Sequence, residues 1–183
     1  MDDKIAIEIV TPEGRKLATD ADEVTAPSVN GEFGVLPGHL PLLAALRTGL
    51  VSYRTGGETK KCAVGPGFAE AGANKLLILT DRFVEREGVD PVLVRKELVE
   101  VQGALAKVEL STDEEEKGQM DTLIKKENWL AAQLELYGDP PPATMRPYEQ
   151  YGPPPPPDES EVPLDESGEG SGAGKGAHGG TAH

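Results

Sequence analysis

Few side chains in this sequence belong to the types that perform covalent or metal chemistry. The chain has one cysteine, Cys62, and His39 is the one histidine before residue 139. A nucleophile with its base, or a metal site, needs such groups in clusters. His39 lies in the turn-like stretch PGHLP with no second His or Cys nearby, so we expect it to be exposed and not to bind metal. We expect no catalytic residue, no metal and no cofactor.

Two further stretches imitate binding sites. The acidic run 113–116 offers oxygen ligands for a hard cation, but it lacks the glycine and the ligand alternation of a calcium loop. A capped helix start explains it better. The stretch 168–176 (GEGSGAGKG) resembles a phosphate-binding loop, yet the required spacing puts Glu169 where the first glycine belongs and Gly176 where Ser or Thr follows the lysine. We expect neither to bind a ligand.

The charge, the hydropathy and the cysteine content of the chain limit which partners and which cellular compartment we expect for it. The chain carries 32 acidic and 18 basic residues, net −14, and its basic runs are no longer than pairs. Nucleic acids and anionic lipids are bound by clustered Lys and Arg, so we expect no nucleic-acid contact. No apolar run approaches the roughly 20 residues of a membrane span, and no signal peptide is recognisable. Cys62, in a strand-like run on the same side as Val64, is expected to be a buried small apolar residue in a reducing compartment.

Residues 1–87 have the pattern of a β-sandwich. Ile5, Ile7 and Ile9 alternate with less apolar residues, as in a half-buried strand. The pair Gly56-Gly57 separates two strand-like runs and predicts a hairpin. The run 75–80 (KLLILT) is almost continuously apolar, which favours a central strand or one buried on both faces. Many short strands separated by Gly and Pro predict an all-β sandwich of about ten strands.

Residues 88–138 have the pattern of a helical hairpin. Asp90-Pro91 predicts the start of the first helix, and capping boxes in 111–116 predict the start of the second. Gly138 suits the position after the last turn. Each helix carries one apolar stripe, and the stripes are expected to pack on each other, on the sandwich or on another protein. The packing residues that we predict are Val94, Leu98, Val101, Leu105, Leu123, Leu130 and Leu134.

Residues 139–183 differ in composition from the rest. They hold 10 of the 16 prolines and 8 of the 22 glycines, with 8 acidic and 2 basic residues. Such a segment buries too little apolar surface to offset the entropy of ordering it, so we predict a disordered tail. The run 153–157 favours polyproline II, which could serve as a spacer or as a ligand for a groove, but a solvated extension without function is the preferred interpretation.

The stretch 31–46 (GEFGVLPGHLPLLAAL), with Thr48-Gly49 after it, resembles the signature of ATP synthase epsilon subunits. The preceding VTAPSVN, the segment 64–70 (VGPGFAE) and the LLILT run resemble the family as well. The resemblance covers about residues 5–137. It implies a ten-stranded sandwich followed by a two-helix hairpin.

The resemblance also implies a mechanical role in a subunit without catalytic activity. In the family, the sandwich links the central gamma shaft to the membrane rotor ring, so that proton-driven rotation supports ATP synthesis. It would act at the cytoplasmic face of the cell membrane, held there by the complex. Polar residues at the positions of Glu32 and His39 contact the ring. The surface expected to do so here contains Glu32, Gly34, Leu36, His39 and Leu40.

The hairpin of many family members extends towards the catalytic head and blocks ATP hydrolysis. Members that bind ATP carry Asp-x-x-Arg-Ala at its start, whereas here Leu93 follows Asp90 at that spacing and the arginine is Arg95. Inhibitory second helices are typically basic, but residues 113–137 hold three Lys and seven acids. The sequence therefore predicts no nucleotide site and a weak brake.

Three alternatives compete with these interpretations. The apolar loop 34–41 can instead fold back over the sandwich core. The chain can be a non-catalytic sandwich module that binds sugar or peptide, with the hairpin as a dimerisation arm, although its scattered aromatics supply no platform. It can also be a small enzyme using acid pairs, which would be active as an isolated chain.

Overall fold

The computed structural model describes residues 4–110 and 118–141. The chain divides into a unit of residues 1–150, which holds every described element, and a second unit, 151–183, outside the described residues. The predicted capping boxes in 111–116, the acidic run and the tail from residue 142 also lie outside them. The elements are β1 (Ile5–Thr11), β2 (Gly14–Ala21), β3 (Glu23–Ser28), β4 (Gly31–Val35), β5 (Leu42–Leu46), β6 (Gly49–Thr55), β7 (Glu58–Val64), β8 (Gly67–Gly72), β9 (Lys75–Thr80), β10 (Phe83–Glu85), the 3-10 turn η1 (Arg86–Gly88), α1 (Pro91–Leu110) and α3 (Met120–Tyr137).

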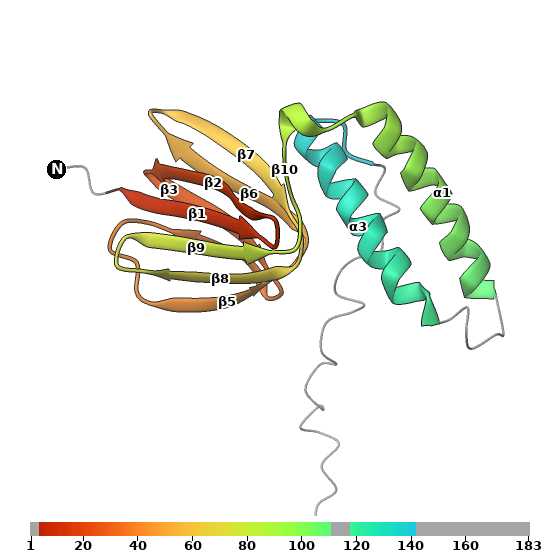
Figure 1. The fold of residues 1–183 in the computed structure, drawn as a ribbon, viewed down its shortest axis with the longest axis horizontal. Helices are drawn as coiled ribbons and strands as arrows, with labels where there is room; N and C mark the ends of the chain where they lie inside the picture. Colours follow the sequence, from red (N-terminus) through yellow and green to blue (C-terminus); the bar gives the residue numbers. More distant parts are fainter. Residues whose placement is uncertain (1–3, 111–117, 142–183) are drawn as a thin grey trace, which may run out of the picture. The chain divides into compact units, whose positions relative to one another are not determined.

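The ten strands form one hydrogen-bonded sheet folded into a sandwich, as the sequence predicts (Figure 1). The strand order is β10-β7-β6-β3-β5-β8-β9-β1-β2, and β4 pairs with β3 outside this path. Neighbours are antiparallel except β1 and β9, which are parallel. The hairpin predicted at Gly56-Gly57 joins β6 to β7, and both glycines have positive φ.

The sandwich core is built from the inward side of each alternating strand. Ile5, Ile7 and Ile9 of β1 are 0–2% exposed, and Cys62 and Val64 of β7 face the same cluster. Of the two alternatives for the LLILT run, the structure has the central strand. β9 is central, between β8 and β1, but it is not buried on both faces because Leu79 is 48% exposed. Its alternation is hidden because both faces carry leucine or isoleucine.

The helices α1 and α3 run side by side and have a core of their own (Figure 1). The carboxylate of Asp90 accepts hydrogen bonds from the N–H groups of Val92 and Leu93, so it caps α1 as expected. Gly138, at φ 97°, ends α3 in the left-handed conformation. No helix in the described ranges is long and apolar enough to cross a membrane.

The seven predicted packing residues all lie in this helical cluster. Leu123 is half-buried and the other six are buried. Glu127 interrupts the stripe of α3 at a position only 4% exposed, where its Oε1 accepts a hydrogen bond of 3.2 Å from Gln102 Nε2. A buried carboxylate left unpaired would be costly, so this bond fixes how the helices align. The sequence did not indicate Ile124, Ala131, Ala132 and Leu136, which are also buried on α3.

A row of residues across three strands forms the platform under α3. Ala63 of β7 pairs with Leu50 of β6 on one side and Val84 of β10 on the other, and all three pack in the helical cluster. Two arginine–aromatic contacts flank this platform. The guanidinium of Arg82 lies 5.9 Å from the ring centre of Trp129, and that of Arg86 lies 5.5 Å from that of Tyr137.

Candidate partner-docking surface

The strand β4 sorts its side chains between the core and the outside. Val35 is 2% exposed and the half-buried Phe33 packs against the sandwich core, while Glu32 and Gly34 are exposed. Successive side chains of a strand point to opposite faces, so Glu32, Gly34 and the following Leu36 share the outward face. Because β4 pairs with β3 alone, it is also an edge strand.

The loop from Leu36 to Pro41 keeps its leucines in solvent. Leu36 is 54% and Leu40 is 79% exposed, so the alternative in which this loop folds over the core is wrong for both residues. The N–H of His39 donates to the carbonyl of Leu36 at 3.0 Å, closing a turn around Gly38, whose φ is 80°. The two leucines lie four positions apart in one short loop and are candidates for contact with a partner.

His39 is half-buried rather than exposed as expected. Its Nδ1 lies 2.7 Å from the carbonyl oxygen of Leu40. A carbonyl only accepts, so this contact needs the proton on Nδ1, and Nε2 makes no hydrogen bond to the residues that the structure describes. The side chain therefore presents one polar atom beside the leucines of the loop.

Glu32 and His39 do not meet at one point. Glu32 pairs with Pro27 near the start of β4, and His39 follows four residues after the strand ends. From Glu32 to Val35 the strand alone spans about 10 Å. The predicted residues Glu32, Gly34, Leu36, His39 and Leu40 instead form an extended ribbon, which we call the β4 edge.

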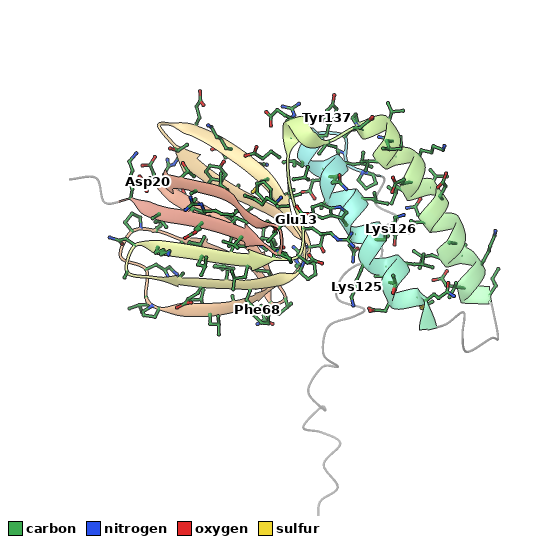
Figure 2. The ribbon with its side chains drawn as sticks, viewed as in Figure 1. Glu13, Asp20, Phe68, Lys125, Lys126 and Tyr137 are labelled. Carbon is green, nitrogen blue, oxygen red and sulfur yellow. The ribbon has the colours of Figure 1, made fainter. Side chains whose placement is uncertain are left out.

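A second apolar surface was not indicated by the sequence. Leu43 of β5, Phe68 of β8 and Leu79 of β9 are 72%, 59% and 48% exposed. Phe68 pairs with Leu79, and Leu43 has the strand parity of the position opposite Phe68, so the three share one outer face. Figure 2 labels Phe68 at the outside of the sheet. We call this surface the β5-β8-β9 face.

The side chains of Cys62, Asp90 and Arg95 have structural roles. Cys62 is 1% exposed, and burial raises the pKa of its thiol to about 12, so the thiol stays protonated near neutral pH. Asp90 caps α1, and Arg95 forms an ion pair with Asp139 beyond the end of α3. In the described ranges no three His, Cys, Asp or Glu residues gather in a way that would hold a metal.

The sandwich matches a known family. A family model described as "ATP synthase, Delta/Epsilon chain, beta-sandwich domain" matches residues 4–86. The "ATP synthase epsilon chain" of Nitratidesulfovibrio vulgaris (strain DP4) is 37% identical over 113 residues, which cover 62% of this chain and 84% of the relative. The chain belongs to the ATP synthase epsilon chain family. The relative of that name from Carboxydothermus hydrogenoformans is 37% identical over 107 residues, 58% of this chain and 80% of its own.

The fold of this epsilon-family chain is also found in a solved structure. A chain in the cryo-EM structure of Euglena gracilis mitochondrial ATP synthase aligns with a TM-score of 0.61 at 24% identity, covering 72% of this chain and 82% of its own. At 24% identity, this similarity supports the fold and nothing beyond it. The family model, which matches residues 4–86, includes the β4 edge and also Leu43, Phe68 and Leu79 of the β5-β8-β9 face.

Proposed function

We propose that this epsilon-family chain is a non-catalytic rotor subunit that links the gamma shaft of ATP synthase to the membrane rotor ring. Ring rotation driven by protons would then turn the shaft. The observation that carries the proposal is the β4 edge, where Glu32, Leu36 and Leu40 are exposed and His39 is half-buried, on a well-packed sandwich. A closely packed core transmits force without deforming.

We assign the β4 edge to the loops of the rotor ring. The exposed leucines supply apolar area, at about 1.5–3 kcal/mol for each such side chain fully buried. Glu32 and His39 supply polar contacts that fix orientation. Attachment through the ring would hold the chain at the cytoplasmic face of the cell membrane without a membrane span of its own.

A crosslinking experiment tests this assignment. Cysteine at position 32 or 39, in a Cys62→Ala background, is expected to crosslink to ring-subunit loops in the assembled enzyme. Lys60→Cys is the matched control, because Lys60 is exposed on β7, away from the β4 edge. Crosslinking of positions 32 and 39 to the catalytic head alone would refute the assignment.

We assign the β5-β8-β9 face to the gamma shaft. Phe68 and Leu79 are cross-strand neighbours, so a helix of the shaft would cover both together. Phe68→Thr keeps a strand-forming residue and removes the aromatic ring. We expect it to weaken co-purification with gamma at least several-fold, whereas Val99→Thr on the exposed side of α1 is expected to change nothing. Equal losses in both variants would contradict this assignment.

We propose that the hairpin is at most a weak brake on ATP hydrolysis. Lys125 and Lys126, the basic pair of α3 (Figure 2), are each bound to an acid: Lys125 to Asp121 at 2.5 Å and Lys126 to Glu97 at 3.5 Å. They therefore offer little free positive charge to an acidic segment of the catalytic head. Exposed pairs contribute only about 0.2–1 kcal/mol each, but several contacts of the wrong sign shift a balanced equilibrium.

Truncation after Glu87 tests the brake. We expect little change in the ATPase rate of the reconstituted enzyme. A rise of several-fold would show a strong brake and would refute the charge argument. The chain's coupling role is measured separately, as proton pumping per ATP hydrolysed.

A further inference from the structure

The turn between β8 and β9 has an unusual backbone and lies against the β4 edge. Ala73 (φ 49°) and Asn74 (φ 58°) are the two residues other than glycine that have positive φ in the described ranges. This conformation is unfavourable for alanine and better tolerated by asparagine. A β-carbon on the preceding Gly72 would lie 3.6 Å from Pro41 Cα, so the turn touches the end of the docking loop.

Asn74 makes two hydrogen bonds to different parts of the sandwich. Its backbone carbonyl accepts from the N–H of Ala6 at 2.8 Å. Its side-chain Oδ1 accepts from the N–H of Gly38 at 2.7 Å, across 36 positions of sequence. Gly38 is the centre of the turn that carries Leu36, His39 and Leu40. The side chain of Asn74 therefore reaches the tip of the docking loop.

The bond to Gly38 ties the loop to the β8–β9 turn. Among the hydrogen bonds of residues 4–110 and 118–141, it is the one that joins the loop between β4 and β5 to another element. The other bonds within the loop, from His39 to Leu36 and Leu40, are local and do not set its direction. The exposed Leu36 and Leu40 do not anchor the loop, whose packing contacts come from the half-buried Pro37 and His39 and from Pro41 beside Gly72.

We infer that Asn74 is a positioning residue for rotor-ring docking: its side chain holds the loop 36–41 in the shape that the ring binds. This inference rests on the proposed function. A loop held in its bound shape loses less entropy on binding than a free one, so removal of the bond weakens docking without touching any residue that contacts the ring.

The test uses two substitutions that separate the acceptor atom from the backbone. Asn74→Gly keeps the positive φ and the carbonyl that binds Ala6, and it removes only Oδ1. Asn74→Asp keeps an acceptor oxygen at the same place and tolerates the same backbone. Ala73→Gly is the matched control, because it changes the adjacent position of the same turn and leaves both bonds of Asn74 intact.

Three quantities are measured on the full-length chain: exchange of the Gly38 amide, the thermal midpoint, and affinity for the purified rotor ring in nanodiscs. Loss of one hydrogen bond is expected to speed Gly38 exchange and to weaken ring binding about three- to ten-fold in Asn74→Gly. Asn74→Asp and Ala73→Gly are expected to bind like the native chain, and all thermal midpoints to stay within a few degrees.

The outcomes distinguish the inference from the proposed function. Failure of the native chain to bind the ring overturns the proposed function. Native binding with unchanged affinity in Asn74→Gly overturns this inference alone. Equal loss in Asn74→Asp and Asn74→Gly also overturns it, because the acceptor oxygen would then not be the cause. Rescue by Asn74→Asp together with slow Gly38 exchange supports it.

Discussion

The glycine at position 67 makes the sandwich sensitive to one methyl group. Gly67 begins β8 opposite Thr80 of β9. A β-carbon built there lies 1.9 Å from the carbonyl oxygen of Leu79 and 2.9 Å from Thr80 Cα. Both are backbone atoms and cannot rotate away. We therefore predict that Gly67→Ala destabilises the sandwich strongly.

The size of the effect follows from this geometry. Ordinary van der Waals contact begins at 3.4 Å, so β8 and β9 must separate by about 1.5 Å at this point. Overpacking of this kind costs about 1–3 kcal/mol. The shift also strains the 3.0 Å bond from the Thr80 hydroxyl to the carbonyl of Gly65, worth about 0.5–1.5 kcal/mol. The sum is about 2–4 kcal/mol, a large part of the stability of a typical domain.

Gly34→Ala is the matched control for this prediction. Its β-carbon would lie 3.9 Å from the Val24 carbonyl oxygen, which is ordinary contact. Alanine in a strand interior is favoured over glycine by about 0.5–1 kcal/mol, so this variant is expected to be neutral or slightly more stable. The free energy of unfolding is measured by urea denaturation followed by circular dichroism.

At about 4 °C per kcal/mol, Gly67→Ala is expected to lower the thermal midpoint by about 8–16 °C. A native-like midpoint in Gly67→Ala would refute the close-approach argument. It would mean that β8 and β9 absorb the methyl group by a small shift. An equal fall in Gly34→Ala would instead show that both strands need glycine for a reason other than contact with the neighbouring backbone.

Three further predictions concern the helices and the thiol. Leu134→Ala, at a position 0% exposed in the helical cluster, is expected to cost about 2–5 kcal/mol and to raise amide exchange in α1 and α3 before the sandwich. Because burial raises the pKa of the Cys62 thiol from 9.0 to about 12, Cys62 is expected to resist thiol reagents at pH 8 until the chain unfolds. The stability that the buried thiol contributes is present below pH 9 and is lost between about pH 9 and 12, where the unfolded chain loses the thiol proton first. Cys62→Ala is expected to reduce this loss of stability at high pH. Calorimetry is expected to show no micromolar ATP binding to the isolated chain, since Asp90 caps α1 and Arg95 pairs with Asp139; stoichiometric binding would contradict this.

The strands and helices were largely predictable because their signals are local. Alternation at Ile5–Ile9, the Gly56-Gly57 turn and the Asp90-Pro91 cap each act within a few residues, and the structure contains all three. The outward position of Glu32 and Gly34 on β4 follows from the same alternation of strand residues. The binding role of the β4 edge stays a prediction, as does the domain boundary at residue 87.

What the sequence could not show depends on neighbours far along the chain. The exposed face of β9 could not be recognised, because Leu79 is as apolar as the buried Ile78 and only the absence of a covering layer distinguishes them. Two packing partners bury α3 over a wider arc than one stripe, which is why Ile124 and Leu136 were missed. Asn74 looked like an ordinary turn residue, since Gly38 lies 36 positions away.

The strand β7 contributes side chains to both cores. Cys62 and Val64 belong to the sandwich cluster, while Ala63 between them belongs to the helical cluster. On the sandwich strands, the helical cluster includes a single cross-strand row, Leu50, Ala63 and Val84, of which only the small Ala63 is fully buried. This row and the two arginine–aromatic contacts contribute about 3–5 kcal/mol together.

Separating the hairpin from the sandwich therefore costs less than unfolding either part, because each keeps its own core. The free energy of separating the hairpin from the sandwich is a few kcal/mol, which a partner's binding energy can overcome. Trp129, the single tryptophan, reports this step directly, since Arg82 lies over its ring in the docked hairpin. We expect Arg82→Gln to shift Trp129 fluorescence and raise exchange in α3 while leaving the exchange of β1 and β9 unchanged. Loss of protection in β1 and β9 as well would show that the two cores unfold as one unit.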